Sequence, residues 1–210
     1  MPRRQRTILY RGICSTTEAQ KRLPRIASRH QVAGAHLILD GYNVLLILYH
    51  YLVGYPVFLC RDGLVRDAGL SRGRSARKER LADVARRLFA VLLGPRGPVP
   101  AGVTAILDEA VSHSGEHAGI IRKACGEVLA GREEISPEPE FGVLLSPRAD
   151  AALADPSLAD AGPAEAQAHY LATSDSQIID RSPLSIVDLP RWTLEESFGV
   201  DVEKLRVIEH

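Results

Sequence analysis

The sequence contains few cysteines, aromatic residues and lysines. Its three cysteines, Cys14, Cys60 and Cys125, lie far apart and form neither a CxxC pair nor a zinc-binding spacing. A sparse, odd set of this kind is typical of a reducing compartment, and we predict a cytoplasmic location. Aromatic residues make up 5% of the chain, which disfavours base stacking along a long single-strand groove. Lysine supplies only 4 of the 26 basic residues; because such a skew often follows genome base composition, the arginine content alone does not indicate RNA binding.

The chain also lacks an excess of charge, a signal sequence and a long uninterrupted apolar run. Its 26 basic and 26 acidic residues cancel, so no global basic field recruits nucleic acid. The first residues, MPRRQRTILYRG, are charged but have no apolar core, so we expect no secretory signal. Residues 44–60 are nearly all apolar, but the run is short for a membrane span and is interrupted by His50, Gly54 and Pro56. We therefore expect a buried helix and a buried strand there, and no association with a membrane.

The overall composition is that of a soluble globular protein. Apolar residues are 45% and charged residues 25% of the 210, which excludes wholesale disorder, collagen and a coiled coil. The charge is unevenly spread, because residues 1–30 carry a net charge of +7 and residues 132–165 a net charge of −6. Two interpretations stay open: two solvated segments whose charges cancel, or a basic edge that steers a polyanion.

Apolar runs and the turn signals between them predict alternating strands and helices. Strands are expected at residues 36–39, 56–60, 103–107, 142–146, 169–173 and 185–189, and helices at residues 42–53, 75–93 and 116–130. The pair Asp62-Gly63 is a hairpin-turn signal. Strands that alternate with helices favour an α/β fold with a parallel sheet. We divide the chain into a basic helical N-terminal segment (1–34) and an α/β domain (35–210) with an acidic insertion near 132–168.

Three of the predicted strands lead into an aspartate. Asp40 follows LIL, Asp108 follows AIL and Asp175 follows LATS. In an open α/β sheet, ligands bind outside the carboxyl ends of the strands, so these side chains are candidates for one crevice. Three neighbouring carboxylates repel one another unless a cation lies among them, and oxygen ligands favour Mg²⁺ or Mn²⁺. The alternative for each aspartate is an ordinary helix N-cap.

The strings around these aspartates resemble the PIN-like nucleases. LILDGYNVL, LDEAVSHSGE and TSDSQIIDR are similar to the motifs of the NYN branch, which includes the bacterial YacP-like proteins. In that branch a D-G-Y-N element follows the first strand, an Asp follows a middle strand and a T-S-D element follows a later one. Over residues 8–190 the chain resembles more closely a prokaryotic family of unknown function that joins an N-terminal helical segment to a domain with these three strings. Relatives usually begin with a longer helical region, so either a partner surface is missing here or the start is misassigned.

The resemblance implies a PIN-like, three-layer α/β/α fold with a central, mainly parallel sheet, and a metal-dependent endoribonuclease activity. Asp40, Asp108 and Asp175 would be catalytic and would hold one or two Mg²⁺ or Mn²⁺ ions, which activate a water and stabilise charge on the phosphate. Glu79 is the candidate for a further catalytic acid, with a surface glutamate in the run RKER as the alternative. Asp180 is either a further metal ligand or a structural cap or ion-pair partner.

Substrate contacts are predicted around the same strand ends. The candidates are Asn43, Ser112, His113, Ser114, Ser174 and Arg77. Side chains and free backbone N–H groups at helix starts suit a phosphate, although these polar residues also fit ordinary capping. His113 and His117 have the i, i+4 spacing of some zinc ligands, but no HExxH motif or third soft ligand accompanies them. The arginine-rich residues 61–78 are either a basic loop that grips the RNA backbone or a solvated loop.

Other functions fit the sequence less well. A phosphatase of the haloacid dehalogenase type needs a second Asp where Tyr42 stands, and the chain has neither the GxxxxGK(S/T) element of P-loop NTPases nor the GxSxG elbow of acyl hydrolases. The serious alternative is a non-catalytic RNA- or protein-binding module that keeps the fold. RNA is the expected partner, and a homodimer or a protein bound through the N-terminal segment are further candidates.

Overall fold

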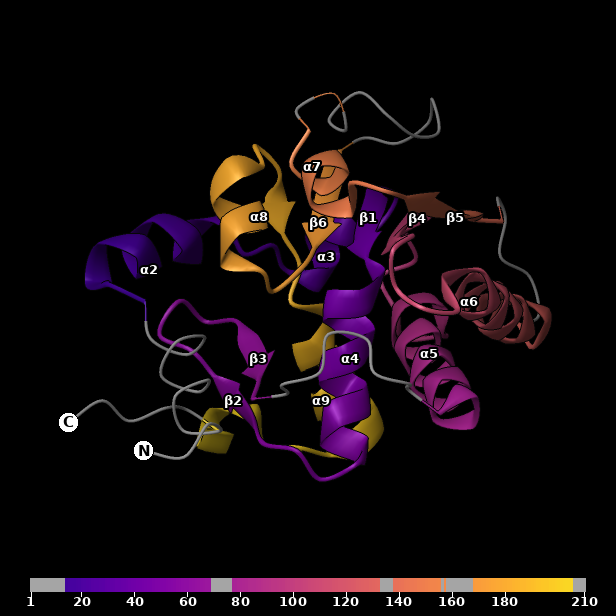
Figure 1. Ribbon diagram of the computed structural model, residues 1–210. Coiled ribbons are helices and arrows are strands. Elements are labelled where there is room, and N and C mark those ends of the chain that lie inside the picture. The colour runs from indigo at the N-terminus through magenta and orange to yellow at the C-terminus, as the bar shows by residue number, and fades with distance from the viewer. Residues whose placement is uncertain (1–13, 69–76, 133–137, 156, 158–167, 206–210) are drawn as a thin grey trace.

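A parallel β-sheet forms the centre of the described part of the chain. The computed structural model describes residues 14–68, 77–132, 138–155, 157 and 168–205 (Figure 1). Five strands form the sheet in the order β5-β4-β1-β6-β7, and every neighbouring pair is parallel. The strands are β1 (His36–Asp40), β4 (Gly102–Asp108), β5 (Glu140–Ser146), β6 (His169–Ala172) and β7 (Ser185–Ile186). The predicted α/β class and parallel sheet are confirmed.

Helices cover both faces of this sheet (Figure 1). One apolar core contains residues of α4 (Gly41–Leu52), α5 (Lys78–Leu93), α6 (Ser114–Ala130) and α9 (Leu189–Phe198), and a second contains residues of α7 (Ala149–Leu153) and α8 (Ser176–Arg181). Successive residues of a strand point to opposite faces, so Leu37 and Leu39 of β1 enter the first core and Ile38 enters the second. The structure therefore has the predicted three layers, α/β/α.

A two-stranded hairpin packs beside α4. Its strands β2 (Val57–Leu59) and β3 (Val65–Asp67) are antiparallel, and Gly63 in the connecting turn has a φ of 79°. Glycine adopts this left-handed conformation without steric cost, and the hairpin predicted at Asp62-Gly63 is confirmed. The apolar run 44–60 forms most of α4 and then β2. No helix among the described residues has the length and hydropathy that a membrane crossing requires.

The described N-terminal segment is helical and lies against the β7 edge of the sheet. It contains α2 (Thr16–Arg22), the 3-10 turn η1 (Leu23–Arg25) and the short α3 (Arg29–Val32). A capping box starts α2: the Ser15 hydroxyl accepts from the Glu18 amide, and the Glu18 carboxylate accepts from the Ser15 amide. Further along, Ile26 bridges Ile186 of β7, and the Ala27 amide donates to the Ile186 carbonyl. The short N-terminal helical segment is therefore confirmed.

The last predicted strand is shorter than expected. Of residues 185–189, β7 contains only the first two, and α9 already begins at Leu189. The reason is a helix cap, because the side chain of Asp188 accepts a hydrogen bond from the Arg191 amide at 3.0 Å. A final 3-10 turn, η3 (Val202–Leu205), follows α9.

The acidic stretch 132–168 holds more structure than the sequence predicted. The strand expected at 142–146 is present and starts two residues earlier. The helix α7, which was not predicted, follows it and buries Ala149 and Leu153 in the second core. Residues 133–137, 156 and 158–167 of this stretch lie outside the described residues.

Candidate functional site

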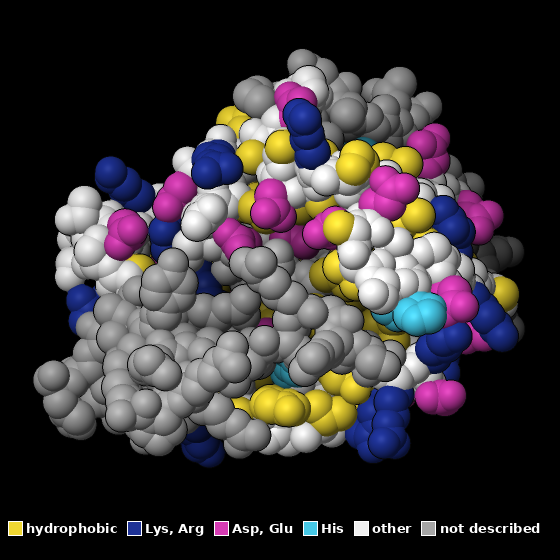
Figure 2. Space-filling model, in the orientation of Figure 1, with side chains coloured by type: hydrophobic (Ala, Val, Ile, Leu, Met, Phe, Trp, Pro, Cys, Tyr) yellow, Lys and Arg dark blue, Asp and Glu magenta, His cyan; other side chains and the backbone are white. Residues whose placement is uncertain are grey.

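The three aspartates lie at one edge of the sheet. Asp40 ends the central strand β1, Asp108 ends its neighbour β4, and Asp175 follows β6 on the other side. Asp40 pairs with Ile106, so Asp108 lies two residues further along, at about 8 Å between Cα atoms from ordinary strand spacings. Figure 2 shows acidic side chains gathered where this edge meets α4 and α8. The predicted placement of these aspartates at the carboxyl ends of neighbouring strands is therefore observed.

Asp40 is the buried member of the three, with 5% of its surface exposed. Its Oδ2 accepts hydrogen bonds from Asn43 Nδ2 (2.6 Å) and from the Thr173 hydroxyl (2.7 Å), and its Oδ1 accepts from the Asn43 amide (3.4 Å). Burial raises the pKa of Asp40 to about 6; the charge of Asp175 adds to the rise, and the bonds from Asn43 and Thr173 oppose it. Asn43 therefore holds the carboxylate of Asp40 in place.

Asp175 is coupled to Asp40 through Thr173. The Thr173 hydroxyl donates to Asp40 and accepts from the Asp175 amide at 3.2 Å. The side chain of Asp175 also caps α8, because its Oδ1 accepts from the amides of Gln177 (2.8 Å) and Ile178 (3.3 Å). Its Oδ2 accepts no hydrogen bond from the described residues. Asp175 therefore acts as a helix cap and still directs one oxygen elsewhere.

Asp108 is half-exposed on the other side of Asp40. Its Oδ1 accepts from the Ala110 amide at 2.9 Å, which folds the chain back after β4. Next to it, α4 starts so close to β4 that a Cβ atom on Gly41 would lie 2.3 Å from Leu107 Cδ2. Glycine at position 41 is thus what allows the start of α4 to approach Asp108.

Tyr42, which lies near Asp108, contacts His117, and neither residue was among the predicted site residues. The Tyr42 hydroxyl is 3.0 Å from His117 Nδ1, and the rings meet edge to face. Burial, and then the charge of Asp108, raise the pKa of Tyr42 to about 12, so its hydroxyl stays protonated. Burial lowers the pKa of His117. The only signals in the sequence were the D-G-Y-N string and the 113/117 spacing, and neither identifies this pair.

The predicted substrate contacts at the start of α6 differ in exposure. Ser112 and His113 are exposed, whereas Ser114 is buried and donates to the Glu109 carbonyl at 3.1 Å. His113 has a φ of 65°, an uncommon conformation for a residue with a side chain. Its Nδ1 is 3.3 Å from a carboxylate oxygen of Glu116. Of this set, the exposed serine and histidine are the side chains that a ligand can reach.

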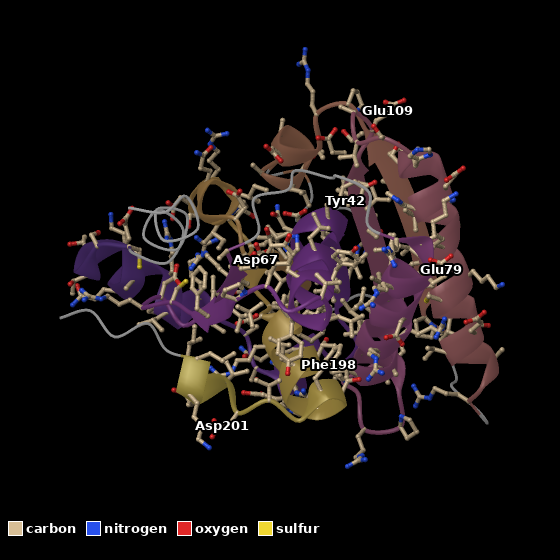
Figure 3. All side chains as sticks on the ribbon, turned by 60° about the horizontal axis from the view of Figure 1, so that its bottom comes forward. Tyr42, Asp67, Glu79, Glu109, Phe198 and Asp201 are labelled. Atoms are coloured by element: carbon tan, nitrogen blue, oxygen red, sulfur yellow. The ribbon has the colours of Figure 1, made fainter. Side chains whose placement is uncertain are left out.

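Four other predicted residues lie elsewhere or are already engaged. Glu79 is exposed on the first turn of α5, to one side of Tyr42 in Figure 3, and forms no hydrogen bond or ion pair with the described residues. Arg77 is exposed just before α5. Ser174 is buried, and its carbonyl accepts from Arg66. Both oxygens of Asp180 bind Arg22, at 2.8 and 2.7 Å, which is the structural role considered for it.

The arginine-rich segment 61–78 is not uniformly a solvated loop. Arg66 lies in β3 with 4% of its surface exposed, and it forms an ion pair with Asp62. Arg66 is therefore unavailable to grip an RNA backbone, and its inclusion in a basic loop was wrong. Arg72 and Arg74 fall outside the described residues.

The donor set suits a hard cation in its chemistry, since carboxylate oxygens are the ligands that Mg²⁺ and Mn²⁺ prefer. Asp108 and Asp175 each have one oxygen that accepts no hydrogen bond within the described part of the chain. In that same part, no three His, Cys, Asp or Glu side chains are grouped closely enough to hold a metal ion. The aspartates share an edge, but local hydrogen bonds hold each of them in its own place.

Comparison with known proteins gives a family. We found no match to the chain among curated proteins or among solved structures. A family model described as "Domain of unknown function (DUF5616)" matches residues 29–192. This range contains all three aspartates and all five strands of the sheet. Because the match covers well over half of the chain, the protein belongs to this family of domains of unknown function, DUF5616.

Proposed function

We propose that the edge formed by Asp40, Asp108 and Asp175 is the active site of a divalent-metal-dependent endoribonuclease of the PIN-like, NYN type. The observation that carries this proposal is the position of the three aspartates at the carboxyl ends of three neighbouring parallel strands, β4-β1-β6. The likeness of the D-G-Y-N, V-S-H-S-G-E and T-S-D strings to PIN-like nucleases supports the same chemistry and suggests RNA as the substrate.

All three aspartates are metal ligands in this proposal, and two neutral residues support Asp40. Asp40, Asp108 and Asp175 would hold Mg²⁺ or Mn²⁺, which when bound activates a water and stabilises charge on the phosphate. Asn43 and Thr173 orient the buried Asp40 through its Oδ2. The burial that raises the pKa of Asp40, together with the nearby charge of Asp175, is the electrostatic situation that a bound cation relieves.

Phosphate contacts fall to the exposed residues near the same edge. Ser112 and His113 lie at the start of α6, beyond the end of β4, and both are exposed. Ser114 and Ser174 are buried and bonded within the protein, so we assign them to the support of the site. Arg77 lies before α5, exposed, and is available to a more distant phosphate of a strand.

The second candidate is a binding module without catalysis. It is favoured by one observation, namely that no three potential ligands among the described residues are gathered around a common point. Such a module would bind RNA or a protein with the same fold and would be indifferent to Mn²⁺. Metal titration therefore separates the two functions.

The test is Mn²⁺ binding by calorimetry together with cleavage of a labelled single-stranded RNA, for the wild type, Asp108→Asn and Glu109→Gln. Asp108→Asn should reduce the rate of Mn²⁺-dependent cleavage by at least about 100-fold. Even the loss of residues that only support metal ligands lowers metal affinity or activity by about 10- to 100-fold. Its circular dichroism spectrum and unfolding midpoint should stay close to the wild type, since Asp108 is half-exposed. Glu109→Gln removes a charge from the same turn and should cleave like the wild type.

Two outcomes would overturn the proposal. Undiminished cleavage by purified Asp108→Asn would show that the activity does not use this edge. A wild type that binds RNA but neither binds Mn²⁺ nor cleaves would establish the binding module instead.

A further inference from the structure

A buried cluster of ionic side chains lies next to the proposed site and joins three separate parts of the chain. Its centre is Asp62 in the hairpin turn, whose side chain is 0% exposed. Arg66 of β3 and Arg22 of α2 bind this carboxylate, and their side chains are 5% and 3% exposed. From α8, Asp180 binds Arg22 and the Ser176 hydroxyl accepts from both arginines. The hairpin, the N-terminal segment and α8 therefore meet at one carboxylate.

Arg66 uses its whole guanidinium group in this cluster. Nη1 and Nη2 donate to the two oxygens of Asp62 at 2.7 and 2.8 Å, which is the bidentate pairing that fixes the plane of the group. The remaining side, Nε, donates to the Ser174 carbonyl at 2.9 Å, and Nη2 also lies 3.2 Å from the Ser176 hydroxyl. Arg66 thus holds the residue before Asp175 and the residue after it.

We propose that Arg66 is a positioning residue that holds Asp175 at the acidic edge by clamping Ser174 and Ser176 on either side of it. This inference rests on the proposed function, because it assigns Arg66 to the support of a proposed metal ligand. Asp175 lies in the short connection between the end of β6 and the start of α8. The path of this connection therefore places its carboxylate. The clamp fixes that path through a buried bond to Ser174 and a partly buried bond to Ser176.

The chemistry of the clamp requires arginine. A lysine has a single ammonium group and cannot pair with both oxygens of Asp62 while donating sideways to the Ser174 carbonyl. The guanidinium is also buried and fully paired, so it does not serve as a free cation for phosphate. Arg66 therefore acts through contacts within the protein, whereas Arg77 is exposed to solvent.

The chain contains a matched control at the other end of the same helix. Arg25 donates to the carbonyls of Ile179 (2.7 Å), Ser182 (2.6 Å) and Leu184 (2.7 Å), beyond the middle of α8. Both arginines thus reach α8 from another element and bind backbone carbonyls. Only Arg66 reaches the residues next to Asp175, so Arg25→Gln reports the general cost of losing such a contact.

The experiment compares Arg66→Gln with Arg25→Gln in the full chain, by amide hydrogen exchange and by Mn²⁺ affinity. In Arg66→Gln the amides of Gln177 and Ile178, which cap onto Asp175, should exchange about 10-fold or more faster relative to the amides of β1. Mn²⁺ should bind about 10- to 100-fold more weakly, which is the usual effect of losing a residue that supports a ligand. Arg25→Gln should leave both quantities within about 2-fold of the wild type.

A role in stability alone predicts a different pattern. If Arg66→Gln accelerates exchange uniformly over the sheet, or leaves the Gln177 and Ile178 amides unchanged, the positioning role is refuted. Should Arg66→Gln fail to fold, Arg66→Lys keeps the charge beside Asp62 but loses the bond to Ser174, and the same two measurements apply to it. A wild type that binds no Mn²⁺ would refute the proposed function, and the exchange measurement would still decide whether Arg66 holds Asp175.

Discussion

A single hydroxyl, that of Thr173, connects the carboxyl group of Asp40 to the backbone of Asp175 in the proposed site. It donates to Asp40 Oδ2 at 2.7 Å and accepts from the Asp175 amide at 3.2 Å. Asp40 is buried, so each hydrogen bond it accepts lowers the cost of its negative charge. A neutral residue therefore supports the charge of Asp40 and links it to Asp175, which makes Thr173 a sensitive position for mutation.

Thr173→Val should lower the free energy of unfolding, and by more at high pH than at low pH. The folded-state pKa of Asp40, about 6, lies above its ordinary value of 3.8, so the folded state binds a proton more tightly and loses stability as the pH rises from about 4 to about 6. Removing the hydroxyl withdraws support from the charged form and raises this pKa further. We expect a loss of about 1 kcal/mol at pH 4 and about 2–3 kcal/mol at pH 8.

Urea unfolding of the wild type, Thr173→Val and Thr173→Ser at both pH values measures this difference. Thr173→Ser keeps the hydroxyl and should show a similar loss at the two pH values, because only a methyl group is removed. An equal loss at pH 4 and pH 8 in Thr173→Val would mean that the hydroxyl does not support a charged Asp40.

At the scale of the elements, α4 starts close to β4, at the edge where Asp40 and Asp108 end their strands. Gly41 is the first residue of α4 and directly follows Asp40. A Cβ atom there would lie 2.3 Å from Leu107 Cδ2 and 3.3 Å from the Ile106 carbonyl oxygen. Leu107 is itself buried, so it has little room to move aside. A side chain at position 41 would therefore force Leu107 or the start of α4 to shift.

Gly41→Ala should destabilise the protein by about 1–3 kcal/mol, the usual cost of overpacking a core, and should weaken Mn²⁺ binding as the start of α4 is displaced. Gly126→Ala is the control, because its added Cβ on the exposed face of α6 meets no atom within 4 Å. That variant should be stabilised by about 0.5–1 kcal/mol, since alanine is the better helix former. Thermal unfolding and Mn²⁺ calorimetry measure both effects, and a neutral Gly41→Ala would disprove the close approach.

The elements themselves could largely be predicted from the sequence, because they depend on local patterns. Apolar runs ending in Asp40 and Asp108 identified strands whose carboxyl ends meet, and the Asp62-Gly63 pair identified the hairpin. Long-range pairing could not be predicted in this way. Nothing near Asp180 or Arg66 in the sequence shows that their partners lie 158 residues and 108 residues away, on Arg22 and on the Ser174 carbonyl.

The same reasoning explains what was missed around the site. Thr173 stood in the T-S-D string, but its bond to Asp40 joins residues 133 positions apart. The Tyr42–His117 contact likewise depends on where the starts of α4 and α6 lie in the fold. The helices α7, α8 and α9 were missed because they are short, and the periodic signal of a helix grows with its length.

At the scale of the whole molecule, basic residues in the described part of the N-terminal segment form contacts within the protein. Two interpretations were open for its net charge of +7: mutual cancellation with the acidic stretch, or steering of a polyanion. In the structure, Arg22 pairs with Asp62 and Asp180, Arg25 binds carbonyls of and beyond α8, and Arg29 pairs with Glu196. These three cations therefore attach the segment to the domain, and neither interpretation describes them.

Arg22 forms the strongest of these attachments, and its loss should lower the stability of the whole protein. Arg22→Ala should reduce the free energy of unfolding by about 3 kcal/mol, because removing one partner of a buried ion pair leaves the other with less compensation. This expected loss lies at the low end of the usual range for breaking a buried ion pair, for two reasons. Arg66 still pairs with Asp62, and Asp180 is half-exposed and can be rehydrated. Since the pair is buried, high salt should change this loss little.

Lys21→Ala provides the comparison, because Lys21 is the neighbouring cation on α2 and is exposed. It should change stability by no more than about 0.5 kcal/mol. Both can be followed by urea unfolding with the fluorescence of Trp192, the single tryptophan, which lies in the main core and not in the ionic cluster. If Arg22→Ala unfolds at the same urea concentration as Lys21→Ala, the ion pairs of Arg22 do not stabilise the attachment of the N-terminal segment. A loss confined to Arg22→Ala would show that one buried cation joins the segment, the hairpin and α8 into a single cooperative unit.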